Sequence, residues 1–156
     1  MIGFGYDIHR LDYGKKLILG GIEISSEIGP IAHSDGDVLI HSIIDSILGA
    51  CGMGDIGDMF PDTNNQYKNI SSVKLLKEVL DKINGKFKII NIDCMIILEK
   101  PKLKDYKNQI KENISKILNL DISRVNIKAG TNEKLDALGR NEACAVYSVC
   151  QVEEVN

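Results

Sequence analysis

The segment 143–152 constrains the fold most strongly, because it alternates like a β-strand yet carries apolar side chains on both faces. One face has Ala143, Ala145, Tyr147 and Val149, and the other has Cys144, Val146, Cys150 and Val152. A sheet that helices cover on one side needs only one apolar face. The second apolar face therefore predicts self-association through the sheet, as in a symmetric oligomer.

The other segments predict a mixture of strands and helices. Apolar patterning favours strands over 2–9 and 16–24, joined as a hairpin by a turn at 12–14, and over 87–98 and 125–129. Helical spacing and capping residues favour a helix over 37–51 and a second that begins at Ser71 or Ser72 and ends at Gly85. A third helix is predicted to begin at Pro101 and to continue along an apolar stripe to Ile117. The segment 52–69 is too irregular for either. This order predicts an α+β fold, with helices packed on one face of a mixed sheet.

Composition excludes several classes of protein. With 156 residues, 44% hydrophobic and 26% charged, the chain suits one soluble domain over 1–156. A net charge of −3 argues against nucleic acid and membrane partners, and no apolar run approaches the ~18 residues of a membrane span. The cysteines form no C-x-x-C pair, which favours reduced thiols. We expect a cytoplasmic bacterial protein, or one of a plastid-type organelle if a targeting segment has been removed.

All three histidines, His9, His33 and His41, lie in the first 41 residues, and each has a carboxylate nearby. In a strand, Asp7 and His9 point to the same face, so one ion can bind both. His41 lies in the first turns of the predicted helix 37–51, whose N-terminus Asp35 or Asp37 can cap. Two imidazoles and one carboxylate leave a tetrahedral ion one open position, which is the arrangement of catalytic zinc.

The same side chains allow other interpretations. The histidines can lie close together by accident and serve as ordinary hydrogen-bonding groups. Asp45, four residues after His41, is either an acceptor for the second imidazole nitrogen or a solvated carboxylate.

Two polar loops carry further candidate residues. Residues 52–57 match the dinucleotide fingerprint G-x-G-x-x-G, but they follow a predicted helix, whereas that fingerprint follows a strand. These glycines instead allow close approach of a ligand beside Asp55 and Asp62, with a solvated acidic loop as the alternative. Residues 130–134 combine a hydroxyl, a carboxylate and a cation, and Glu133 offers oxygen to Mg²⁺, with an ordinary turn as the alternative.

Four motifs occur in order along the chain: G-Y-D-I-H-R-L at 5–11, A-H-S-D-G-D-V at 32–38 with His41, G-D-I-G-D-M-F-P-D-T at 54–63, and T-N-E-K-L at 131–135 with Gly139 and Arg140. A Pro-Lys pair stands at 101–102. Together they cover essentially the full chain and resemble the 2-C-methyl-D-erythritol 2,4-cyclodiphosphate synthase family of non-mevalonate isoprenoid biosynthesis. The chain departs from the family pattern at Gly130, Asn132, Ala137 and Asn141, which affects the expected packing of substrate rather than the chemistry.

The resemblance implies a ferredoxin-like sandwich that forms a homotrimer through its sheets, with active sites between subunits. It implies one Zn²⁺ per subunit on Asp7, His9 and His41, a second divalent cation, Mg²⁺ or Mn²⁺, on Glu133, and transition-state stabilisation by His33 and Thr131. The residues implied for the methylerythritol phosphate are Ser34, Asp55, Gly57, Phe60, Pro61, Asp62, Thr63 and Asn64, and those implied for the cytidine part are Leu98, Pro101, Lys102, Leu103, Lys104, Gly130, Thr131 and Asn132. Asp7, His9, His33, Glu133 and Arg140 are implied as further substrate contacts.

The implied activity is an intramolecular phosphoryl transfer. The 2-phosphate of 4-diphosphocytidyl-2-C-methyl-D-erythritol 2-phosphate attacks the β-phosphorus, releases CMP and closes a cyclic diphosphate. Such a reaction needs alignment and charge neutralisation more than a covalent nucleophile, which agrees with a site of cations and polar groups. The competing interpretations are a zinc-dependent phosphohydrolase, in which the metal activates water, and a non-catalytic metal-binding or assembly module.

Overall fold

The computed structural model describes residues 1–61 and 63–155 and contains a mixed sheet with the strand order β4-β1-β7-β5-β6. These strands are β1 (Ile2–Tyr13), β4 (Ile28–Pro30), β5 (Phe87–Ile97), β6 (Val125–Gly130) and β7 (Ala143–Glu154). β5 and β6 run parallel, whereas the other neighbouring strands are antiparallel. The prediction of an α+β fold around a mixed sheet is confirmed.

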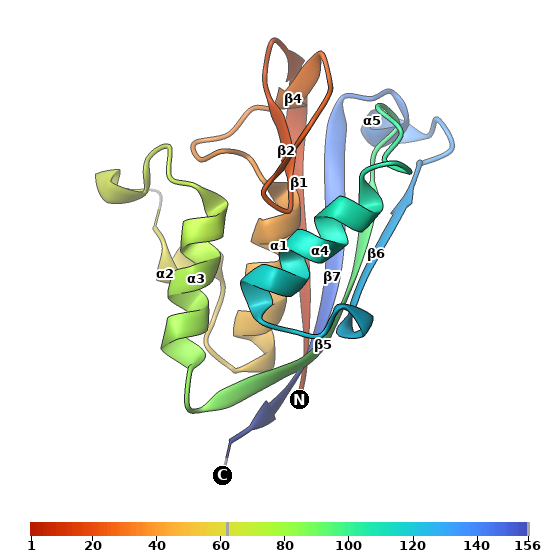
Figure 1. Ribbon diagram of the computed structural model, residues 1–156. Helices are drawn as coiled ribbons and strands as arrows, with labels where there is room; N and C mark the ends of the chain where they lie inside the picture. The colour runs from red at the N-terminus through yellow and green to blue at the C-terminus, as the bar shows by residue number, and fades with distance from the viewer. Residues whose placement is uncertain (62, 156) are drawn as a thin grey trace.

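Three helices form a layer on one face of this sheet (Figure 1). α1 (Val38–Ala50) crosses β1 and β7, α4 (Lys107–Leu118) covers β6, and α3 (Ser72–Ile83) packs beside both helices. The shorter elements are α2 (Ile56–Met59), α5 (Asp136–Gly139) and the 3-10 turns η1 (Asn65–Tyr67) and η2 (Ile122–Arg124). Within 1–61 and 63–155, none of the helices has the length and apolar character that crossing a membrane requires.

Two glycines let α1 lie directly against β1. A Cβ added to Gly5 would stand 1.9 Å from the carbonyl oxygen of Ser42, and one added to Gly3 would stand 1.9 Å from that of Ser46. Asp7 follows these glycines on the same face of the strand, because side chains alternate. The close approach therefore brings His41, in the first turn of α1, over Asp7.

Replacing Gly5 with alanine should destabilise the protein by about 1–3 kcal/mol and weaken metal binding, because α1 must move away from β1 and carry His41 with it. Urea unfolding measures the change in stability. Gly49→Ala is the matched control, since a Cβ there meets its nearest atom only at 3.8 Å and a helix prefers alanine to glycine. A Gly5→Ala protein as stable as the wild type would contradict this packing.

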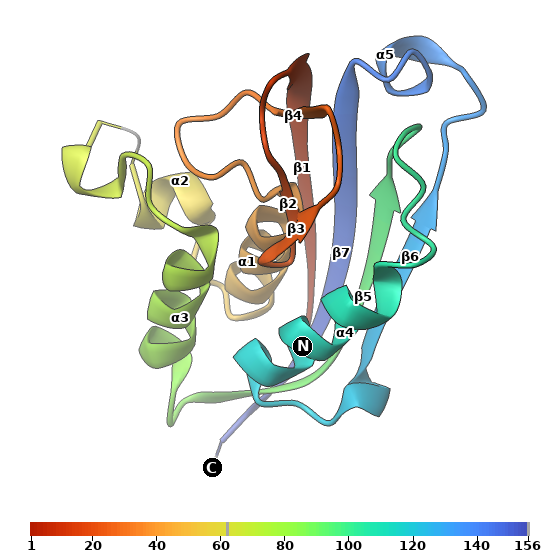
Figure 2. The ribbon, with the colours of Figure 1, turned by 45° about the horizontal axis from the view of Figure 1, so that its top comes forward.

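The predicted hairpin between 2–9 and 16–24 is wrong. β1 pairs with β7 and β4, while residues 16–24 fold back on themselves as β2 (Leu17–Leu19) and β3 (Ile22–Ile24) (Figure 2). The N–H groups of Gly20 and Gly21, both at positive φ, donate to the buried Asp37 carboxylate at 2.9 and 2.7 Å. Asp37 also caps α1, as predicted, by accepting from the Ile40 N–H at 3.0 Å. A distant carboxylate thus anchors this turn at the start of α1.

Two predicted boundaries also need correction. Pro101 does not open a helix, because α4 begins only at Lys107 and the first part of the apolar stripe, including the buried Leu103, belongs to the preceding turn. The segment 52–69 contains α2, a single turn closed by a capping box between Asp55 and Asp58. Elements this short leave no periodic signal in the sequence.

The sheet face opposite the helices is apolar and exposed. Phe4 and Tyr6 of β1 pair with Val149 and Tyr147 of β7, and the ring centroids of Tyr6 and Tyr147 lie 4.9 Å apart. Phe4 is 61% exposed, and Tyr6 and Tyr147 are each 41% exposed. The two apolar faces predicted for the last strand are therefore present: one is buried under the helices, and the other exposes Tyr147 and Val149, whereas its Ala143 and Ala145 are buried.

Candidate active site

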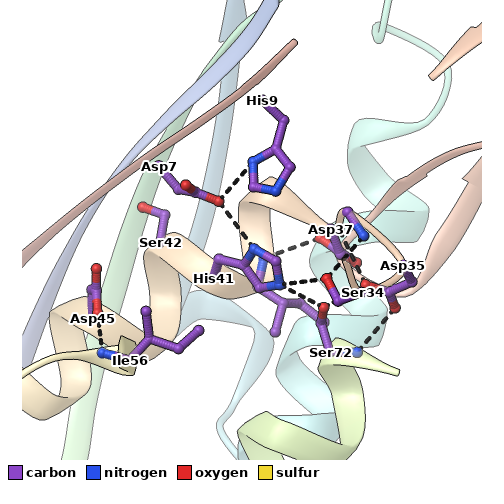
Figure 3. A network of polar contacts seen from close by, with 12 residues as sticks. Asp7, His9, Ser34, Asp35, Asp37, His41, Ser42, Asp45, Ile56 and Ser72 are labelled. Atoms are coloured by element: carbon purple, nitrogen blue, oxygen red, sulfur yellow. Dashed lines mark hydrogen bonds and ion pairs between the residues drawn. The ribbon is translucent and has the colours of Figure 1, made fainter. Parts of the chain in front are cut away.

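Asp7, His9 and His41 converge where α1 crosses β1 (Figure 3). Asp7 Oδ2 lies 3.1 Å from His9 Nδ1 and 3.0 Å from His41 Nδ1. Among the described residues, no other group of histidine, cysteine or acidic side chains gathers its ligand atoms in this way. The strand supplies two of the side chains and the helix the third, as their spacing predicted. We call these three residues the triad.

The charges of the triad favour a cation between the carboxylate and the imidazoles. Burial alone would raise the pKa of Asp7, but the hydrogen bond with His41 and the nearby imidazole of His9 outweigh it and hold that pKa below its ordinary value. Burial alone would lower the pKa of His41, yet the hydrogen bond and charge of Asp7 raise it. The pair thus holds a proton or, in its place, a metal ion.

His9 provides a test of whether the triad fits a metal. Its Nδ1 is buried and, although Asp7 Oδ2 is 3.1 Å away, it forms no well-oriented hydrogen bond within the described part of the chain. Buried nitrogens without a partner are rare in folded proteins. An ion held by all three side chains would give this nitrogen a partner, and two nitrogens plus one oxygen suit Zn²⁺. The residues therefore fit a metal centre.

The second nitrogen of His41 contacts Ser72. His41 Nε2 lies 2.8 Å from Ser72 Oγ and 3.3 Å from Ser34 Oγ. Asp35 in turn accepts hydrogen bonds from both the hydroxyl and the N–H of Ser72. Asp45, one candidate acceptor for this nitrogen, instead accepts from the N–H of Ile56 at 2.8 Å and so anchors α2 (Figure 3).

His9 and His41 of the triad line a cavity of about 380 Å³, a size that suits a small molecule. Of the residues implied to bind substrate, those that line it are His9, His33, Ser34, Gly57 and Phe60. Asp55, Pro61, Thr63 and Asn64 belong to the adjoining 55–64 segment without lining the cavity, and Asp62 lies outside the described residues. His33 is therefore near the triad but not part of it.

Most residues implied for the cytidine part line a second cavity, of about 190 Å³. Those residues are Leu98, Lys102, Leu103, Lys104, Gly130 and Thr131. Glu133 is exposed beside it, and its N–H donates to Thr131 Oγ1 at 3.4 Å. The two cavities have no lining residue in common.

The two cavities lie at the same end of the sheet but on different strands. Pairing places Ile8, Ala145, Ile97 and Gly130 in one row across β1, β7, β5 and β6. Strands stand ~4.8 Å apart, so β1 and β6 are about 14 Å apart along this row. Within one chain, the triad and Glu133 therefore stand apart.

The remaining implied residues contact other parts of the surface. Pro101 lines a neighbouring groove with Asn141. The side chain of Asn132 bonds within its own loop, to Asp136 at 3.0 Å, and Arg140 pairs with Glu142 at 2.9 Å.

The departure at Asn141 has a structural explanation. Asn141 has a φ of 61°, in the left-handed region that glycine and asparagine adopt most readily. Its Oδ1 accepts a hydrogen bond from the N–H of Lys100 at 3.0 Å. Asparagine thus keeps the turn and adds a contact to the 98–104 loop.

Sequence reasoning missed several residues of the first cavity, mostly apolar ones: Ile8, Arg10, Ile31, Ala32, Ile56, Tyr67, Ile70 and Leu75. Apolar residues give no chemical signal. Tyr67 is an exception, because an aromatic residue stands out in the polar segment 61–69, and its ring lies edge-on to Phe60 with centroids 5.2 Å apart. Ser72 and Asp35 were recognised only as possible helix caps.

An α+β sandwich with a His-His-Asp centre in a cavity defines a candidate metal-dependent enzyme. The model of the YgbB family matches residues 1–153. The chain is 53% identical over 150 residues to the 2-C-methyl-D-erythritol 2,4-cyclodiphosphate synthase of Clostridium acetobutylicum, covering 96% of this chain and 97% of that protein. The chain belongs to the YgbB family, and the resemblance inferred from the four motifs is confirmed.

Solved structures share the fold. The bifunctional IspDF of Campylobacter jejuni superposes with a TM-score of 0.94 at 45% identity, over 99% of this chain and 42% of that one. This chain thus spans about two fifths of that bifunctional protein. IspF of Plasmodium falciparum, in a CDP complex, superposes with a TM-score of 0.86 at 37% identity, over 99% of this chain and 96% of that one.

Proposed function

We propose that residues 1–156 form one synthase domain that converts 4-diphosphocytidyl-2-C-methyl-D-erythritol 2-phosphate into 2-C-methyl-D-erythritol 2,4-cyclodiphosphate and CMP. The observation that carries this proposal is the triad, two of whose side chains line the first cavity, in a chain 53% identical to a synthase of that name. The CDP complex of the Plasmodium relative supports a cytidine nucleotide as part of the substrate. The bacterial relative supports a cytoplasmic location.

Four side chains are proposed as metal ligands. Asp7, His9 and His41 would hold one Zn²⁺ per subunit, and Glu133, an exposed carboxylate beside the second cavity, would hold Mg²⁺ or Mn²⁺ together with the substrate diphosphate. When bound, these ions supply positive charge that neutralises the phosphates and lowers the cost of bringing them together.

The remaining residues of the two cavities align the substrate. His33 and Ser34 line the first cavity beside the triad, where they can donate hydrogen bonds to the 2-phosphate. Thr131 lines the second, with Lys102 and Lys104 as cations for the nucleotide phosphates. His33 and Thr131 would stabilise the charge that develops on the transferring phosphoryl group. Alignment of two groups of one molecule is the main catalytic requirement here.

A complete site requires two copies of the chain. Along the row of paired residues that contains Ile8 and Gly130, β1 and β6 lie about 14 Å apart. The triad on β1 is therefore far from Glu133, which follows β6. We propose that the chain forms a homotrimer of ferredoxin-like sandwiches through the exposed sheet face, which brings the first cavity of one copy to the second cavity of its neighbour. The exposed Phe4, Tyr6 and Tyr147 support this assembly, since monomers rarely expose such contiguous apolar patches.

Sedimentation equilibrium should return about three times the chain mass of 17.2 kDa. Tyr147→Lys should dissociate the trimer, because it places a charge in the centre of the apolar face. Tyr13→Lys is the matched control, since Tyr13 is a tyrosine of β1 that is 77% exposed and lies beyond the strand pairing with β7. A monomeric wild-type protein at micromolar concentration would contradict the shared site.

Identification of the product tests the proposed reaction. Incubation with 4-diphosphocytidyl-2-C-methyl-D-erythritol 2-phosphate, Zn²⁺ and Mg²⁺ should yield CMP and the cyclic diphosphate in equal amounts. Phosphorus NMR distinguishes these two products. A zinc-dependent phosphohydrolase would also release CMP, but it would leave an open-chain bisphosphate, because water rather than the 2-phosphate attacks. The open-chain product would overturn the proposal in favour of hydrolysis.

A further inference from the structure

His41 has a second set of contacts, on the side away from Asp7. From its Nε2, hydrogen bonds run through the hydroxyl of Ser72 to the carboxylate of Asp35 (Figure 3). Ser72 is fully buried as the first residue of α3, and Asp35 is half-buried in the loop before α1. This chain of contacts joins three segments that lie far apart in the sequence.

The direction of these hydrogen bonds follows from the donors available. Both oxygens of Asp35 already accept: Oδ2 accepts the N–H of Ser72 at 2.9 Å, and Oδ1 accepts the N–H of Asp37 at 3.1 Å. A carboxylate in this role only accepts, so the single hydroxyl proton of Ser72 points to Asp35. Ser72 Oγ is then free to accept, and His41 Nε2 must carry the proton.

This direction fixes the tautomer of the ring. A neutral imidazole with a proton on Nε2 has its lone pair on Nδ1, and Nδ1 is the atom 3.0 Å from Asp7 Oδ2. Two acceptors, a lone pair and a carboxylate oxygen, then face each other across the position proposed for the metal. Ser34 Oγ, at 3.3 Å from Nε2, accepts from the N–H of Gly36 and keeps its own proton, so it can either donate to Nε2 or accept from it and does not by itself fix the tautomer.

We propose that Ser72 and Asp35 are positioning residues that hold His41 in the tautomer able to bind the metal through Nδ1. This inference rests on the metal centre of the proposed function, and it assigns to these two residues a role beyond capping and packing. Contacts that orient a metal-ligating imidazole commonly change metal affinity 10- to 100-fold when they are removed.

The two residues should fail in different ways. Ser72→Ala removes the acceptor of Nε2–H but leaves the tautomer undirected. Asp35→Asn reverses the direction of these hydrogen bonds, because the asparagine amide can donate to Ser72 Oγ. The Ser72 hydroxyl then donates to His41 Nε2, which favours the ring proton on Nδ1. An Nδ1 that carries a proton cannot bind a metal. Asp35→Asn should therefore weaken zinc binding at least as much as Ser72→Ala.

Two measurements test the proposal. Competition with a chromogenic chelator should give a zinc dissociation constant at least about 10-fold higher for both variants than for the wild type. Asp81→Asn, an exposed change on α3, is the matched control and should leave the constant unchanged. Nitrogen NMR of the histidine rings should show a protected Nε2–H for His41 in the zinc-loaded wild type, faster exchange of that proton in Ser72→Ala, and an Nδ1–H ring in zinc-free Asp35→Asn.

A merely structural role for Ser72 and Asp35 would change stability without changing the tautomer, and an unchanged Nε2–H signature in both variants would overturn the proposal. If the wild type bound zinc and both variants had the same zinc dissociation constant as the wild type, the proposal would also be overturned, but the proposed metal centre would not. Wild-type protein that bound no zinc would instead overturn the proposed metal centre itself.

Discussion

Replacing His41 with alanine should remove the bound zinc and lower turnover by at least about 1,000-fold, since the loss of a metal worth several kcal/mol of transition-state stabilisation corresponds to that factor. The triad holds the ion with three side chains, and Asp7 and His9 alone leave two. The substitution also leaves the half-buried Asp7 carboxylate without its main partner, the His41 ring 3.0 Å away. Elemental analysis and a CMP-release assay measure the two effects.

His33→Ala is the matched control for this change. It also removes an imidazole from the first cavity, but His33 is exposed and lies outside the triad. We expect full zinc occupancy with turnover reduced about 100-fold, as when one donor to a developing charge is lost. Equal zinc contents of His41→Ala and wild-type protein would remove His41 from the metal centre.

Glu133→Gln should suppress turnover about 100-fold while leaving bound zinc intact, whereas Asp7→Asn should reduce zinc itself. The reason is position: Glu133 is exposed after β6, and Asp7 lies in the triad on β1. The amide of glutamine keeps the size of the side chain and removes the charge that a hard divalent ion requires.

A Mg²⁺ titration of turnover, with zinc measured in parallel, separates these effects. Glu112→Gln, an exposed change on α4, should behave as wild type and serves as the matched control. Near-normal turnover of Glu133→Gln across the titration would remove Glu133 from the second metal site.

The three side chains of the triad could be predicted from the sequence because a local pattern surrounds each of them, although the contact between Asp7 and His41 joins residues 34 positions apart. Asp7 and His9 share a strand face by alternation, and His41 follows from the cap at Asp37 and one turn of helix. The two apolar faces of the last strand could also be predicted from a local pattern, since alternation alone places Tyr147 and Val146 on opposite faces. These predictions therefore rest on the two-residue repeat of a strand and the 3.6-residue repeat of a helix.

Long-range contacts account for what the sequence did not predict. The 16–24 hairpin turns at Gly20 and Gly21 because Asp37, which lies 17 and 16 positions further along the chain, accepts their N–H groups. The partner of His41 is Ser72, 31 positions away, rather than Asp45 on the same helix. Asp45 instead accepts a hydrogen bond from the N–H of Ile56, and no periodicity in the sequence reveals a partner that lies on another element.

Mixed trimers test most directly the central claim that two copies of this chain build one synthase site. His41→Ala and Glu133→Gln chains should each be nearly inactive alone. Co-expressed in equal amounts, they should assemble so that about one quarter of the sites join an intact triad to an intact Glu133, which restores about one quarter of the wild-type formation of cyclic diphosphate. A mixture as inactive as either variant alone would contradict the account, because it would show that each site draws both residues from a single chain.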